Sequence, residues 1–87
     1  MTYGYSILAA TANAKATPGI VHFVSLTAGA DTATAIVYDA TSGTSNPIVK
    51  LSAVANTTIQ VELHVPCSTG IRVALTGTAP SCSVIYQ

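Results

Sequence analysis

A chain of 87 residues is long enough for one domain and too short to bury a large hydrophobic core. Its charged residues are three basic and three acidic, so its formal net charge is zero. They make up 7% of the sequence, against about 25% in an ordinary soluble domain. Nucleic-acid binding depends on clusters of Lys and Arg, so this composition argues against a nucleic-acid partner. A neutral surface favours association, and we expect copies of the chain or other partners to cover much of it.

The N-terminal segment does not have the pattern of an export signal. It contains a short apolar run at residues 7–10 but neither a basic n-region nor a long apolar core. No stretch approaches the roughly 20 apolar residues of a membrane-spanning helix. The Asn56-Thr57-Thr58 sequon matters only for an exported protein. We therefore expect a protein that is made and used without export, with no membrane partner.

Period-two alternation divides the chain into short β segments separated by turn residues. Residues 3–8 are predicted to form a first strand or an extended arm, and residues 9–17 an Ala-rich connector that Pro18-Gly19 ends. Further strands are expected at residues 20–28, 32–39, 47–53, 57–65, 71–76 and 82–86. The sequence thus predicts an N-terminal strand or arm plus connector over residues 1–18, and a β-sandwich domain over residues 19–87.

The clearest strand is residues 57–65. Ile59, Val61, Leu63 and Val65 fall on one face, and Gln60, Glu62 and His64 fall on the other. This is the alternation of a half-buried antiparallel strand. Six to seven short strands without a convincing helix predict an all-β fold, a small antiparallel β-sandwich or jelly-roll-like barrel.

Two histidines and two cysteines are the residues to weigh as metal ligands: His22, His64, Cys67 and Cys82. His64 and Cys67 have the H-x-x-C spacing, but structural zinc sites usually have paired short spacings on both sides. Strand parity also points His64 outward, so we expect no metal and no other cofactor. A disulfide between Cys67 and Cys82 is the alternative to two free buried thiols, because adjacent strands could bring them together. Free thiols are favoured for an unexported protein.

Catalytic residue types are present without a catalytic arrangement. Ser68 and His64, with Asp39 or Glu62, have the chemistry of a triad, but nothing in their spacing places a base beside a nucleophile. The glycines are scattered singly at turns and form no phosphate-binding loop. Asp31 and Asp39 lie at strand ends, where carboxylates commonly cap turns. We therefore predict that the protein is not an enzyme and has no catalytic residue.

Tyrosines are the most informative surface candidates, because their amphipathic rings suit interfaces and sugar stacking. Parity places Tyr86 on the core side and Tyr38 on the opposite side from Ala35 and Val37, where it is expected to be exposed. Residues 1–12 are predicted to contact a partner, although a frayed terminus or an ordinary edge strand would have the same pattern. The candidate contact residues are Tyr3, Tyr5, Ile7, Leu8 and Tyr38.

Several stretches between residues 20 and 87 carry a resemblance, which lies in their turns and strand composition. They are residues 26–44, residues 55–58, the turn at residues 66–71 and the ending at residues 76–86. Together they resemble small β-sandwich proteins of tailed bacteriophages, among them capsid cement (decoration) proteins and head-fibre modules. In that pattern a larger apolar residue often stands where this chain has Cys67.

The resemblance implies a viral structural protein on the capsid exterior of the virion, made in the cytoplasm of the host bacterium. It would be a homotrimer that contacts the major capsid protein and stabilises the phage head by bridging capsomers. The alternative is a receptor- or glycan-binding module of a phage fibre, with its site at Tyr38 or a loop. Only that alternative calls for a glycan partner.

Overall fold

Residues 3–43 and 45–87, which the computed structural model describes, form eight β-strands and no helix. The strands are β1 (Gly4–Leu8), β2 (Ala12–Lys15), β3 (Gly19–Thr27), β4 (Ala33–Tyr38), β5 (Pro47–Ala53), β6 (Thr58–Cys67), β7 (Ile71–Thr76) and β8 (Ser81–Tyr86). The prediction of a small antiparallel β-sandwich is confirmed, with eight strands instead of six to seven. The described residues therefore contain no helix that could span a membrane.

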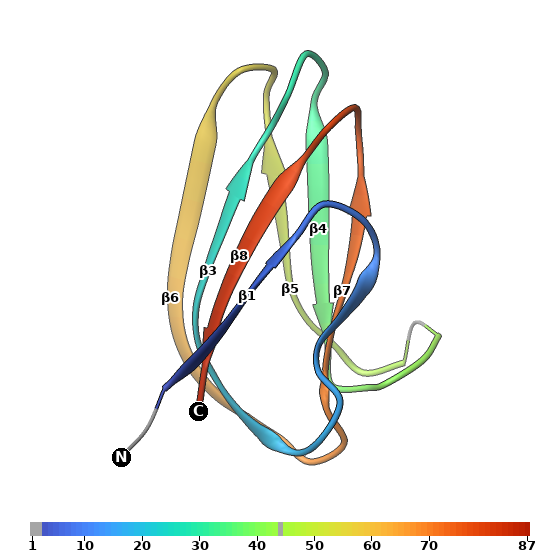
Figure 1. Cartoon of the computed structure of the whole chain (residues 1–87), viewed down its shortest axis with the longest axis vertical. Coiled ribbons are helices and arrows are strands. Elements are labelled where there is room, and N and C mark those ends of the chain that lie inside the picture. Colours follow the sequence, from blue (N-terminus) through green and yellow to red (C-terminus); the bar gives the residue numbers. More distant parts are fainter. Residues whose placement is uncertain (1–2, 44) are drawn as a thin grey trace.

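Two four-stranded antiparallel sheets lie face to face (Figure 1). Sheet A has the strand order β1-β8-β3-β6, and sheet B has the order β2-β7-β4-β5. The hydrogen-bonded pairs β1–β8, β2–β7, β3–β6 and β4–β5 are those of one long antiparallel hairpin rolled up on itself. This strand order is that of a jelly roll, in which two Greek keys form the two sheets.

Strand β2 is the element that the sequence prediction missed. Its residues Ala12–Lys15 lie in the expected connector and have a composition that is poor in β-formers. Tertiary contacts outweigh that propensity: Ala12 is paired with Val73 of β7, and the Ala14 side chain is buried in the core. The Thr11 hydroxyl also accepts a hydrogen bond from the backbone N–H of Leu75 at 3.0 Å. Residues 4–15 therefore supply one strand to each sheet.

The core between the sheets is thin, because many of its side chains are small. The molecule extends only 16 Å along its shortest axis. Its largest fully buried side chains come from the central strands: Leu26, Ile71, Val21, Val24, Val37, Val73, Val84 and Cys82. Alanines fill much of the remainder, namely Ala14, Ala28, Ala33, Ala35 and Ala53. The predicted inward face of residues 57–65 is confirmed, since Ile59, Val61 and Leu63 pack against this core.

Candidate interaction surface

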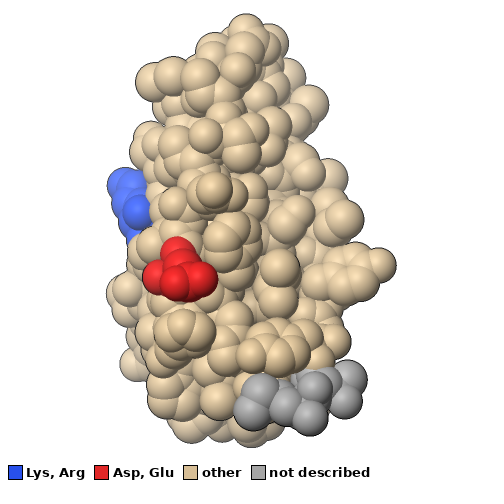
Figure 2. Space-filling view, turned by 90° about the vertical axis from the view of Figure 1, so that its left-hand side faces the viewer, with Lys and Arg blue, Asp and Glu red and all other residues tan. Residues whose placement is uncertain are grey.

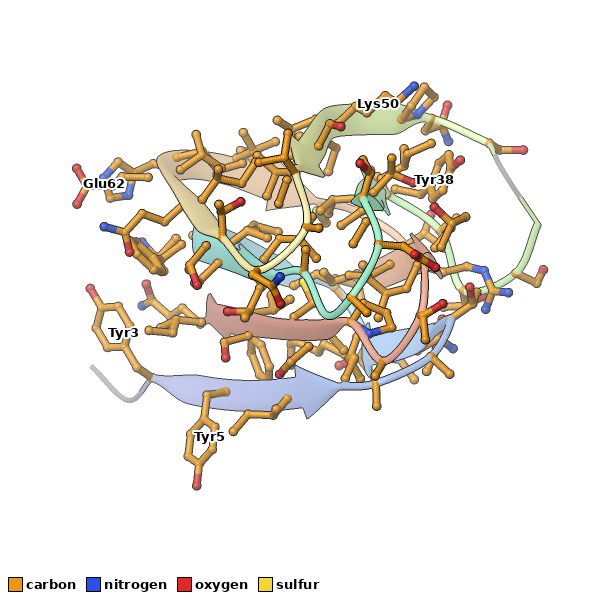
Figure 3. The ribbon with its side chains drawn as sticks, turned by 90° about the horizontal axis from the view of Figure 1, so that it is seen from above. Tyr3, Tyr5, Tyr38, Lys50 and Glu62 are labelled. Carbon is orange, nitrogen blue, oxygen red and sulfur yellow. The ribbon has the colours of Figure 1, made fainter. Side chains whose placement is uncertain are left out.

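The outer side of strand β1 is the most apolar exposed surface of the described residues. Alternation along β1 points Tyr5 and Ile7 away from the core, where they are 72% and 66% exposed. Tyr3, directly before the strand, is 53% exposed. Figure 3 shows the Tyr5 ring projecting from the outer side of β1. Leu8, by contrast, is half-buried against the core.

Neighbouring strands extend this apolar surface across sheet A. Ile85 of β8 lies directly opposite Tyr5 and is also exposed. Phe23 of β3 lies opposite Ile85 and continues the row. We define the β1–β8 patch as Tyr3, Tyr5, Ile7 and Ile85. Of the large hydrophobic side chains that are exposed among the described residues, only Val54 in the β5–β6 turn lies outside this patch.

Charges around the patch are few. Glu62 of β6, opposite Phe23, is an exposed acid on the outer face of sheet A. Lys50 and Arg72 belong to sheet B, at the opposite face of the sandwich. Figure 2 shows one side of the molecule with a single basic and a single acidic group on an otherwise uncharged surface. Contacts made by the β1–β8 patch must therefore come from apolar and hydroxyl groups more than from ion pairs.

Tyr38 does not join this surface. Parity places it outside sheet B as predicted, between Pro47 of β5 and Arg72 of β7, and it is not part of the core cluster. However, it is only 6% exposed, so the prediction that it is exposed is wrong. Alternation gives the side of a sheet on which a residue lies, but it does not show what covers that side. Figure 3 places Tyr38 across the sandwich from Tyr5.

Two histidines that are 42 positions apart meet on the outer face of sheet A. The Nδ1 atoms of His22 on β3 and His64 on β6 are 2.9 Å apart, and the rings meet edge to face. His22 Nε2 lies 2.9 Å from Gln87 Oε1, and the Tyr3 ring packs 4.8 Å from the His22 ring. His64 points outward as predicted. Its partner is His22 and not Cys67, which is buried.

Asp39 is a structural cap for the turn between β6 and β7. Its Oδ1 accepts hydrogen bonds from the backbone N–H of Thr69 at 2.9 Å and of Gly70 at 3.4 Å. Its Oδ2 accepts hydrogen bonds from the backbone N–H of Ser68 at 3.1 Å and from the Ser68 hydroxyl at 3.3 Å. The Thr69 and Ser68 N–H groups lower the pKa of the Asp39 carboxyl below its ordinary value of 3.8. Capping by Asp39 was predicted, but the turn it caps is distant in sequence.

The residues considered for a triad are therefore divided between two places. Ser68 is hydrogen-bonded to Asp39, whereas the His64 ring nitrogen is hydrogen-bonded to His22. Asp31 also makes a capping contact, accepting a hydrogen bond from the Thr78 hydroxyl. None of these contacts places an imidazole base beside the Ser68 hydroxyl.

The two cysteines are free and buried, as the favoured prediction had it. Cys67 is paired with Gly19 at one end of β3, and Cys82 with Leu26 seven residues along the same strand. At about 3.3 Å per residue the two lie roughly 23 Å apart along β3, far beyond the roughly 7 Å limit between the Cα atoms of a disulfide. Burial raises the pKa of the Cys82 thiol to about 11 and also raises that of Cys67.

The described part of the chain contains no pocket and no group of three or more His, Cys, Asp or Glu side chains that could hold a metal ion. Of the predicted contact residues, Tyr3, Tyr5 and Ile7 are brought together in the β1–β8 patch, while Leu8 and Tyr38 are not. Residues 1 and 2 of the predicted contact segment lie outside the described residues. Sequence reasoning missed Ile85, because only the pairing of β1 with β8 places it opposite Tyr5. Comparisons of the chain with protein-family models, curated proteins and solved structures give no match.

Proposed function

We propose that this chain is a non-catalytic structural virion protein, a capsid cement protein that forms a homotrimer and bridges capsomers on the outside of a phage head. The observation that carries the proposal is the β1–β8 patch, a contiguous apolar surface on a chain with almost no charge. The resemblance to phage cement and head-fibre proteins supplies the setting.

The energetics of the patch support an assembly role. Fully burying an aliphatic or aromatic side chain is worth about 1.5–3 kcal/mol, and in the single chain Tyr5 and Ile7 keep most of their surface in water. Polar residues surround the patch: Ser83 lies opposite Ile7, and Ser25 and Gln60 continue that row across the sheet. Apolar surface with a polar rim is typical of protein–protein contacts.

A trimer can bury the β1–β8 patch without burying a charged side chain beside it. Three copies related by a three-fold axis can bring the same β1 side chains together around that axis, which places Tyr5 and Ile7 of each copy at the centre. The lone acid of this face, Glu62, lies across the sheet on edge strand β6, away from the row of apolar residues on β1. A second surface of each subunit would then remain free to contact the shell.

Light scattering after size exclusion tests the oligomer. We expect a particle of about three times the 8.8 kDa chain mass, and we expect a Tyr5→Ser/Ile7→Ser double variant to dissociate at concentrations where the unaltered chain does not. Val54→Ser is the matched control, since Val54 is 64% exposed and lies outside the patch. A monomer or dimer at all concentrations would contradict the trimer.

Binding to the shell is tested separately by co-sedimentation with phage heads that lack the protein. We expect saturable binding and an increase in the temperature at which the heads rupture. Heads that neither bind the protein nor become more heat-resistant would refute the cement role, whatever the oligomer.

A further inference from the structure

We propose that His22 and His64 form a two-histidine chelating site on the outer face of sheet A for a divalent transition-metal ion that prefers imidazole, chiefly Cu²⁺ or Ni²⁺. The proposal does not depend on the cement function. It rests on the geometry of the two rings, on the group that orients one of them and on the local charge.

The distance between the ring nitrogens fits two ligands on one metal ion. With metal–nitrogen bonds of about 2.0–2.1 Å, two ligands at 90° are about 2.9 Å apart, and two at the tetrahedral angle are about 3.4 Å apart. The Nδ1 atoms of His22 and His64 are 2.9 Å apart. This matches the right-angle arrangement of tetragonal Cu²⁺ and Ni²⁺ sites, whereas Zn²⁺ would need the rings to separate slightly.

The metal would replace one bridging proton. In the hydrogen bond between the two Nδ1 atoms, one nitrogen carries a proton and the other accepts it. When the ion binds both lone pairs, the proton on His64 Nδ1 moves by way of solvent to Nε2 of the same ring, so both imidazoles stay neutral. His64 is exposed, so its ring can turn to direct its lone pair at the ion, and water completes the coordination.

Gln87 orients the first ligand. Its Oε1 lies 2.9 Å from His22 Nε2, so it accepts a hydrogen bond from that N–H and leaves the Nδ1 lone pair free for a metal. Histidines that bind metals commonly donate their other ring N–H to an oxygen in this way. Gln87 is itself held by two backbone hydrogen bonds with Ile20, at 2.9 and 3.0 Å. The Tyr3 ring packs against His22 and restricts it further.

Strand pairing brings the two rings together: Val21 is paired with Val65, so the next residues inward, His22 and His64, fall side by side where the register begins to shift. Normal alternation would place Val21 and Phe23 on one face, but the register shifts between them, so Val21 is in the core and Phe23 lies opposite the outward-facing Ile85. Bulges often redirect a side chain in this way. Glu62, two residues from His64 on the same outer face of β6, adds a negative charge that favours a cation nearby.

Calorimetric titration of the untagged protein with CuCl₂, NiCl₂ and ZnCl₂, in a buffer that does not bind metals, tests the site. We expect one ion per chain, tighter binding of Cu²⁺ than of Ni²⁺, and no binding of MgCl₂, since Mg²⁺ prefers oxygen ligands. Free metal at ten times its dissociation constant should raise the apparent folding constant about 11-fold, which is a rise in Tm of roughly 6–11 °C for a domain of this size.

Variants distinguish the chelate from scattered binding. His64→Ala should weaken Cu²⁺ binding at least about tenfold, because the second imidazole acts intramolecularly once the first is bound. Gln60→Ala, another exposed residue of the same strand face, is the control and should leave binding unchanged. Electron paramagnetic resonance of the Cu²⁺ complex should show two coordinated imidazole nitrogens. Binding that changes less than tenfold in His64→Ala, or a spectrum with a single imidazole, would overturn the site.

Discussion

Replacing Leu26 with alanine should remove a large part of the stability of this domain. Leu26 is fully buried on β3, a central strand of sheet A, with Ile59 and Cys82 beside it on the neighbouring strands. Leu→Ala changes in well-packed cores cost about 2.7–5.0 kcal/mol, and the cost rises with the cavity that remains. Four of the eight buried core residues on the strands of the facing sheet are alanines, Ala35 among them, and an alanine side chain has no rotamers with which to fill a cavity. We therefore expect a loss in the upper half of that range.

A loss of about 4 kcal/mol is large for this chain. At 0.05–0.15 kcal/mol per residue, 87 residues correspond to a free energy of unfolding of about 4–13 kcal/mol. For a domain of this size the loss lowers Tm by roughly 15–30 °C. Urea unfolding followed by circular dichroism measures it without needing tryptophan, which the chain lacks. The protein concentration must be the same for all variants, since association adds apparent stability.

Ile7→Ala is the control for this measurement. Ile7 is of similar size but 66% exposed, so in the dissociated chain its truncation should cost less than about 0.5 kcal/mol. If Leu26→Ala costs less than about 1 kcal/mol, or no more than Ile7→Ala, then β3 does not pack between the sheets as described and the reasoning fails.

Two further predictions concern the Asp39 cap and the buried thiols. Asp39→Asn should destabilise the fold at neutral pH, because the native pKa of Asp39 lies below its ordinary 3.8. The difference in free energy of unfolding from the unaltered chain should persist above about pH 4 and shrink as the pH falls toward the lowered native pKa. Urea unfolding at several pH values measures it. With the pKa of Cys82 raised to about 11 from an ordinary 9.0, its thiolate fraction at pH 8 is about 100-fold lower, so alkylation monitored by mass spectrometry should be slow in the native chain and rapid in urea.

Each of these has a result that would contradict it. A stability difference for Asp39→Asn that stays constant down to pH 2 would mean that the carboxylate charge does not hold the turn; Asp31→Asn, which alters the other capping carboxylate, is the comparison. A non-reducing mass that shows an internal disulfide would contradict the placement of the cysteines at opposite ends of β3. Equal alkylation rates in native and unfolded protein would contradict the burial of the Cys82 thiol.

Local pattern was sufficient to predict most of the strands. The bounds predicted for residues 47–53 and 71–76 are those of β5 and β7, and the inward side chains of β6 are those that alternation indicates. These features depend on near neighbours, because side chains alternate with a period of two along any strand. Strand β2 could not be recognised in this way, since its short Ala- and Lys-containing sequence becomes a strand only by pairing with β7, about 60 positions away.

For the surface features, too, the sequence determined one part and the tertiary structure determined the rest. Length and composition by themselves determined that the chain is small and nearly uncharged. Alternation predicted the all-β fold and determined that Tyr5 and Ile7 point the same way. Only the tertiary structure placed Ile85 opposite Tyr5, covered Tyr38, separated Cys67 from Cys82 and brought His22 to His64. Each of these depends on which strands are neighbours and in what register. That information arises from packing between residues far apart in the chain, which no local sequence pattern contains.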